Sequence, residues 1–163
     1  MKRLYALLLL ASVALVPARP FAAPQAGAAL AGRLIEVTAT DNAGKYLFEP
    51  SSITAKPGEQ IHLRLKSTSV AMAKMPKAAM AHNFVLIKSG IDPLQFAMSG
   101  MATGAAGEYL PADKSNVIAF TPLAGMGETV DVSFKAPAAG TYPYICSFPG
   151  HLAAGMKGSL VVK

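Results

Sequence analysis

One cysteine, one histidine and one methionine stand at regular spacing near the end of this chain. Cys146, His151 and Met156 form a Cys-x4-His-x4-Met run, and Cys146 is the only cysteine among 163 residues. A thiolate, an imidazole and a thioether on one short loop are a soft ligand set that selects copper. Blue-copper geometry places two His and one Cys in a plane with a long, weak axial Met, so one more imidazole is needed. His82 is the donor that we expect, because it opens an apolar segment typical of a buried strand.

These four side chains predict a site for one copper ion. Cys146 supplies the short covalent bond, His82 and His151 complete the plane, and Met156 lies axially at longer range. A loop fixed between two strands would hold the ligands before copper arrives, so Cu(II) and Cu(I) can exchange with little rearrangement. A buried inert thiol is the alternative for the single cysteine. It does not explain the neighbouring His and Met.

The elements that must position these ligands are short strands separated by turn residues. Residues 41–44 and the Pro-Gly pair within 56–59 are turn signals. This pattern predicts an all-β fold, a Greek-key β-sandwich of about eight strands. His62 lies on the polar side of an alternating strand and is expected to face solvent. The expected strands are 33–39, 46–48, 52–55, 60–66, 82–88, 116–120, 128–134, 141–146 and 156–162.

One segment departs from the strand pattern. Asp92 and Pro93 form a plausible helix start, and apolar residues recur at helical spacing before Gly104. We therefore expect one short helical excursion within 92–106, packed on the outside of the sandwich. The residues at helical spacing are Leu94, Ala97, Met98 and Met101.

The N-terminus has the pattern of a secretory signal. A basic start precedes an apolar stretch over residues 4–16, and small residues follow. We assign 1–23 to a signal peptide with cleavage between 18 and 29, 24–32 to a flexible segment, and 33–163 to one domain. A membrane anchor is the alternative, but the apolar stretch is short for a bilayer span. The periplasm is an oxidising compartment, where an unpaired thiol is unusual. Metal ligation by Cys146 would explain why it is retained.

Charge argues against some partners. Removal of Lys2, Arg3 and Arg19 with the signal lowers the formal charge from +6 to +3. The remaining basic residues are scattered, so nucleic acid binding has little support. We expect a monomer without stable membrane insertion.

The copper-loop residues also carry a family resemblance. The run Cys146-Ser-Phe-Pro-Gly-His151, the following Met156-Lys-Gly, the pair His82-Asn83, Val117-Ile-Ala and Gly125-x-Gly-Glu resemble the azurin and auracyanin branch of the cupredoxins. The spacing of four residues between His151 and Met156 is similar to that of auracyanins. The disulfide typical of azurins cannot form with one cysteine.

The resemblance implies further site residues. The backbone carbonyl of Ala81 would approach copper opposite Met156, and the backbone N–H of Asn83 would point at the Cys146 sulfur. The backbone N–H of Phe148 is a second candidate donor to that sulfur. His151 would reach the surface inside an apolar docking patch. That patch would comprise Phe148, Pro149, Leu152 and Ala153 with their small neighbours.

The function that we expect is single-electron transfer between redox proteins such as cytochromes or copper reductases. A copper-handling protein that stores or delivers the ion is the alternative, supported by Met72, Met75 and Met80. Met72 and Met75 could equally form a docking surface or an ordinary loop. An enzyme is not expected, because multicopper oxidases and copper nitrite reductases need further histidines, and only His62 remains.

Overall fold

The computed structural model describes residues 32–42, 45–68, 76–77 and 79–163. The predicted signal peptide at 1–23, all but the last residue of the segment 24–32, and both Met72 and Met75 lie outside these residues.

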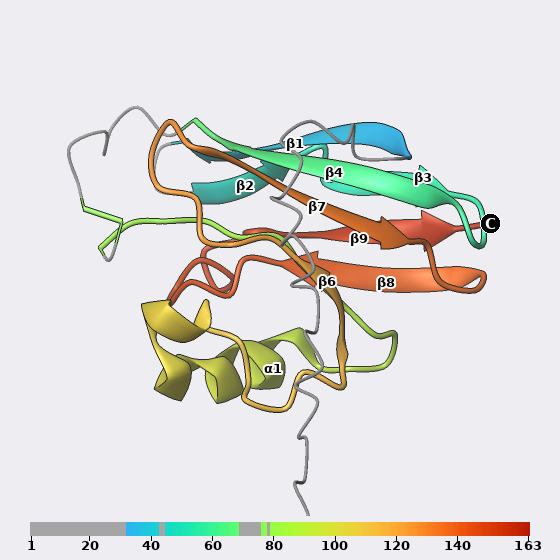
Figure 1. Ribbon diagram of the computed structural model, residues 1–163. Helices are drawn as coiled ribbons and strands as arrows, with labels where there is room; N and C mark the ends of the chain where they lie inside the picture. Colours follow the sequence, from blue (N-terminus) through green and yellow to red (C-terminus); the bar gives the residue numbers. More distant parts are fainter. Residues whose placement is uncertain (1–31, 43–44, 69–75, 78) are drawn as a thin grey trace, which may run out of the picture.

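Two sheets form the layers of a sandwich (Figure 1). One sheet has the order β2-β1-β4-β7 and the other has the order β3-β9-β8-β5-β6. Two pairs, β1 with β4 and β3 with β9, are parallel, because the chain crosses between the layers. The predicted all-β sandwich is confirmed. Its strands are β1 (Arg33–Asn42), β2 (Lys45–Glu49), β3 (Ser52–Ala55), β4 (Gln60–Ser67), β5 (Val85–Ile87), β6 (Val117–Phe120), β7 (Thr129–Lys135), β8 (Gly140–Ile145) and β9 (Lys157–Val162).

Strand β4 shows how the alternation builds the core. Ile61, Leu63 and Leu65 are fully buried between the sheets, as their spacing predicts. The prediction for His62 was wrong, because this side chain is also buried, with 9% of its surface exposed. Alternation does place His62 on the outer face, but β4 lies between β1 and β7, where Leu34 and Ser133 are its paired neighbours. Its Nε2 lies 3.2 Å from Asp131 Oδ1 on β7.

Two predicted boundaries differ from the structure. The strand expected over 82–88 is limited to β5, and His82 forms only an isolated bridge with Ala124. The turn expected over 41–44 is shorter, since β1 continues to Asn42 and β2 begins at Lys45. Both differences come from pairing partners that the local sequence does not reveal.

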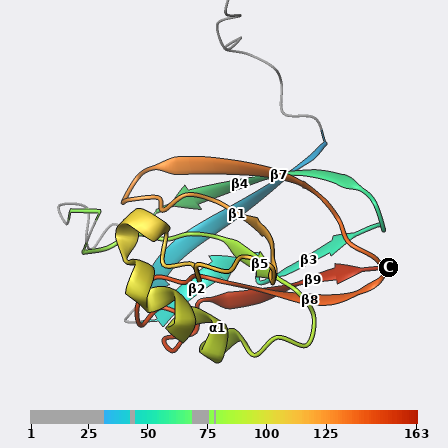
Figure 2. The same cartoon turned by 60° about the horizontal axis from the view of Figure 1, so that its bottom comes forward.

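The helical excursion lies outside the five-stranded sheet (Figures 1 and 2). Helix α1 (Pro93–Gly100) begins at Asp92, whose Oδ1 accepts a 2.8 Å hydrogen bond from the Gln95 N–H. Two 3-10 turns, η1 (Met101–Thr103) and η2 (Ala105–Gly107), follow it.

The helix packs on the sheet through Phe96 and Gly100. Phe96 is buried in a cluster with Val85, Ile87 and Ile145 on the outer side of the sheet. Gly100 approaches the returning chain so closely that a Cβ there would clash with the Tyr109 carbonyl oxygen. The helix therefore buries Phe96 and Gly100, whereas three of the apolar residues at helical spacing remain about half exposed. These are Leu94, Met98 and Met101.

Candidate metal centre

Four side chains from two segments converge at one end of the sandwich. The donor atoms of His82, Cys146 and His151 all lie within 4.8 Å of one another. Cys146 Sγ lies 3.4 Å from His151 Nδ1, and His82 Nδ1 lies 3.2 Å from Met156 Sδ. His82, Cys146 and Met156 are fully buried, and His151 is 3% exposed. Both imidazoles therefore present Nδ1 to a pair of sulfur atoms inside the protein.

The segment from Cys146 to Met156 forms a compact loop between β8 and β9. The His151 N–H donates to the Phe148 carbonyl at 3.1 Å, and the Met156 N–H donates to the His151 carbonyl at 2.9 Å. The Cys146 N–H closes the loop on the Met156 carbonyl at 3.1 Å. Gly150, at φ 85°, supplies a backbone conformation that other residues rarely adopt. The loop thus holds all three side chains by its own main-chain hydrogen bonds.

His82 is fixed by the opposite segment. Its N–H donates to the Ala124 carbonyl at 2.9 Å, and the Ala124 N–H returns a 2.7 Å bond to the His82 carbonyl. Ala81, directly before it, is fully buried. The approach of the Ala81 carbonyl to a metal stays a prediction.

Burial sets the protonation of the two loop ligands. It raises the pKa of the Cys146 thiol to about 12, although the backbone N–H groups of Asn83 and Phe148 donate to the sulfur and oppose this shift. Burial, together with the charge of His82, lowers the pKa of His151 to about 3. At neutral pH His151 is therefore a neutral imidazole, the form that ligates metals. The thiol must lose its proton when a metal binds.

Asn83 joins the two ligand segments. Its Oδ1 accepts a 2.9 Å bond from the Ser147 N–H, and its Nδ2 donates to the Glu108 carbonyl at 2.9 Å. The Ser147 hydroxyl also donates to the Glu108 carbonyl at 3.0 Å. Because Asn83 follows His82 and Ser147 follows Cys146, this network fixes the distance between the two ligands. Glu108 was not found from the sequence, since it acts through its main chain.

The surroundings of His151 differ from the expected surface position. The Tyr46 ring stacks on the imidazole with centroids 4.3 Å apart and planes at 13°. The Phe148 ring lies at 4.7 Å and 32°. These rings cover His151 and leave 3% of it exposed. Tyr46 was not predicted from the sequence, although its place two residues before the buried Phe48 puts both rings on one face of β2.

The predicted docking residues lie on the loop but are unequally exposed. Phe148 is buried, with 8% of its surface exposed, whereas Pro149 and Leu152 are half-buried and Ala153 is exposed. A shallow apolar hollow of about 70 Å³ joins these four residues to α1 and η1. On the helical side it is lined by Leu94, Ala97, Met98 and Met101.

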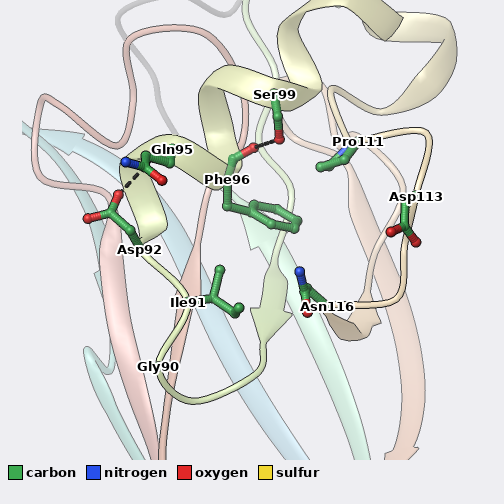
Figure 3. Close-up of a pocket in the computed structure, with 9 residues that line it drawn as sticks. All are labelled: Gly90, Ile91, Asp92, Gln95, Phe96, Ser99, Pro111, Asp113 and Asn116. Atoms are coloured by element: carbon green, nitrogen blue, oxygen red, sulfur yellow. Dashed lines mark hydrogen bonds between the residues drawn. The ribbon is translucent and has the colours of Figure 1, made fainter.

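A larger hollow of about 620 Å³ lies on the other side of α1 (Figure 3). The Phe96 ring points into it, and Asp92 and Gln95 stand at its helical edge. Asp113 and Asn116 line the opposite side. None of its lining residues belongs to the buried His and Cys cluster, so we place the chemistry at that cluster.

Comparison with known proteins decides the family. The profile of the copper binding proteins of the plastocyanin/azurin family matches residues 35–163. The chain belongs to this family. Copper is accordingly its cofactor, and the resemblance to azurins and auracyanins is confirmed. The donor set agrees, because a buried Cys with two imidazoles is the plane of a type 1 copper site.

Two relatives show how far the family likeness extends. Auracyanin-A of Chloroflexus aurantiacus is 45% identical over 116 residues, covering 71% of this chain and 66% of the relative. Azurin-2 of Alcaligenes xylosoxydans xylosoxydans is 38% identical over 128 residues, covering 77% of this chain and 95% of the relative. The chain thus spans slightly less than two thirds of the auracyanin and nearly all of the azurin.

Solved structures agree with the family assignment. Auracyanin A, described as a "blue" copper protein from the green thermophilic photosynthetic bacterium Chloroflexus aurantiacus, has a TM-score of 0.68 and 40% identity. That match covers 80% of this chain and 98% of the other. An azurin of Methylomonas sp. strain J has a TM-score of 0.67 and 32% identity over 82% of this chain and 99% of its own. Within the described part of this family member, no helix is long and apolar enough to cross a membrane.

Proposed function

We propose that this protein is an exported blue copper protein that carries single electrons between redox partners. The observation that carries the proposal is the convergence of Cys146, His82 and His151, with Met156 Sδ 3.2 Å from His82 Nδ1. These residues would hold one copper ion, with Met156 as the axial ligand. Copper bound there supplies a one-electron couple, Cu(II)/Cu(I).

Burial of the ligands supports electron transfer rather than catalysis on a bound substrate. A catalytic metal site keeps a coordination position open to substrate or water. Here the side chains proposed as ligands are between 0% and 3% exposed. An electron can leave such a closed site through the protein, whereas a substrate cannot reach it.

Hydrogen bonds support the low rearrangement that fast electron transfer requires. The loop from Cys146 to Met156 is closed on itself, and His82 is held by two bonds to Ala124. The N–H groups of Asn83 and Phe148 donate to the Cys146 sulfur. These contacts tie the ligands to the surrounding main chain, so the ligands would move little between redox states.

An uncharged face around the loop suits brief docking. Residues 93–107 and 147–156 contain no Asp, Glu, Lys or Arg. Exposed Ala153 and half-buried Leu152 share a hollow with Met98 and Met101, which are 61% and 52% exposed. Redox partners such as cytochromes or copper reductases dock through small interfaces, and this face would receive them.

The export proposal rests on the sequence of 1–23. A basic start, an apolar middle and small residues are the pattern of a cleaved signal. The mature monomer would act in the periplasm. Mass spectrometry of the protein secreted by a bacterial host would show an N-terminus between residues 18 and 29 if the proposal is right.

Copper binding and redox cycling test the main proposal. The parent should bind one copper per chain, turn blue in the oxidised state and cycle reversibly in voltammetry. Cys146→Ser should lose the colour, because the thiolate that donates charge to copper is gone. Ser147→Ala, which keeps the thiol, should stay blue. An equally blue Cys146→Ser variant would refute the site.

The docking face has its own test. Ala153→Lys and Met98→Lys should slow electron self-exchange and leave the colour unchanged, since charge would repel a second copy and neither residue is a ligand. Leu34→Lys is the matched control, because Leu34 is a 49% exposed apolar residue on β1 of the other sheet. Equal slowing by Leu34→Lys would mean that the exchange surface lies elsewhere.

A copper-handling role remains the second candidate to be separated by experiment. This role is supported in the sequence by three methionines, of which Met72 and Met75 lie outside the described residues. Met80 is 5% exposed, so its thioether is not presented to solvent as an ion-catching arm requires. Transfer of Cu(I) to a copper-free acceptor protein would favour handling, and retention of copper through repeated redox cycles would favour the carrier.

A further inference from the structure

We propose that Tyr46 is a positioning residue that holds the His151 imidazole in its ligand orientation and shields it from water. The inference rests on the copper site proposed above. Tyr46 belongs to β2 of the four-stranded sheet, whereas His151 belongs to the loop after β8 of the other sheet. The contact therefore joins the metal loop to the opposite layer of the sandwich.

The geometry of this pair is close to face-to-face stacking. The centroids are 4.3 Å apart and the planes meet at 13°. Flat rings at this distance are in van der Waals contact, so no water fits between them. The Tyr46 ring therefore lies over one face of the imidazole, which restricts both tilting of the imidazole and access of solvent from that side.

The other rings around His151 are tilted against the imidazole and do not stack on it. Phe148 is tilted by 32° at 4.7 Å, and His82 is tilted by 36° at 4.8 Å. Phe148 belongs to the same loop as His151 and would move with it. Tyr46 is the stacked ring held by a separate element, and a separate element is what can fix the orientation of a loop side chain.

Strand β2 places this ring by register. Tyr46 and Phe48 lie on one face of the strand, because side chains alternate. Phe48 is 2% exposed and contacts Tyr144 in the core with centroids 5.5 Å apart. Pairing with β1 fixes the strand further, with Phe48 opposite Ala39. Tyr46 is thus anchored two residues from a buried core position, and it is itself half-buried at the outer side of the site.

Three variants at position 46 distinguish the effect of the aromatic ring from the effects of the hydroxyl group and of side-chain volume. Tyr46→Phe keeps the ring, Tyr46→Leu keeps an apolar side chain without it, and Tyr46→Met is the replacement if the Leu variant does not fold. Tyr142→Leu is the matched control, since Tyr142 is another half-buried tyrosine on β8 whose hydroxyl donates to the Ala138 carbonyl.

The first measurement uses the copper-free protein and proton NMR. A ring stacked on the imidazole shields its carbon-bound protons, so Tyr46→Leu should move the His151 ring signals downfield. Tyr46→Phe and Tyr142→Leu should leave them in place. Unchanged His151 signals in Tyr46→Leu would overturn the stacking itself.

The second measurement is the dissociation constant of Cu(I), by competition with a chromogenic chelator. Loss of a stacked aromatic contact should raise it by about two- to tenfold in Tyr46→Leu, with no change in Tyr46→Phe. An equal constant in Tyr46→Leu, or an equal loss in Tyr46→Phe, would overturn the positioning role. If the parent binds no Cu(I), the copper proposal fails, and the NMR comparison still decides whether Tyr46 orients His151.

Discussion

Replacement of Asn83 by alanine tests the link between the two ligand segments. Asn83 is fully buried, and its side chain serves two main-chain groups on other segments. Its Oδ1 accepts from the Ser147 N–H at 2.9 Å, and its Nδ2 donates to the Glu108 carbonyl at 2.9 Å. Ser147 is 2% exposed, so its N–H lies away from solvent.

The magnitude follows from these two losses. A buried donor left without a partner costs about 1–3 kcal/mol, and a lost hydrogen bond about 0.5–1.5 kcal/mol. The Glu108 carbonyl keeps the Ser147 hydroxyl as a donor at 3.0 Å, so only the N–H is orphaned. We therefore expect Asn83→Ala to lower the free energy of unfolding by about 2–4 kcal/mol.

Urea unfolding of the copper-free protein measures this change without any contribution from metal binding. Asn116→Ala is the control, because Asn116 lines the open hollow beside α1, and its loss should cost under about 0.5 kcal/mol. A loss below about 1 kcal/mol in Asn83→Ala would refute the reasoning, since the orphaned N–H alone should exceed it.

The other predictions concern the reduction potential of the bound copper and the pH dependence of stability. Voltammetry should rank Met156→Leu above the parent and Met156→Gln below it, because a thioether favours Cu(II) more than a hydrocarbon and less than an amide oxygen; a Leu variant below the parent would exclude Met156 as the axial ligand. Phe148→Pro should lower the potential and keep the colour, because proline removes an N–H that donates to the Cys146 sulfur; an unchanged potential would contradict this. The hydrogen bond from Arg64 holds the pKa of Asp131 below its usual range, so the stability it contributes is present above the unfolded-state pKa and is lost as pH falls through the folded-state value. Urea unfolding across pH should show a weaker acid loss in Asp131→Asn than in the parent, and parallel curves would contradict it.

The chemistry of the site could be read from residue types and spacing. The run from Cys146 to Met156 combines ligands that suit copper, and a short loop brings residues with four others between them to one place whatever the rest of the fold does. Strand alternation in β4 likewise predicted the buried face of Ile61, Leu63 and Leu65, because period 2 is a property of the extended chain itself.

Exposure could not be read in the same way, because it depends on neighbours that are distant in sequence. His62 is on the predicted outer face but is covered by the strands on either side of β4. Phe96 and Gly100 form the packing face of α1, whereas Leu94 and Met98 do not. Phe96 packs against β5 and β8, and Gly100 lies against the returning chain.

The orientation of the metal ligands also belongs to the tertiary structure. His151 was predicted as a ligand from the sequence, but the ring that stacks on it belongs to Tyr46, which lies 105 positions earlier in the chain and in the other sheet. The tie between His82 and Cys146 runs through Asn83, Ser147 and the main chain of Glu108. Ligand identity is a local property of side-chain chemistry, whereas the rigidity of the site arises where separate segments meet, and only the packed sandwich brings them together.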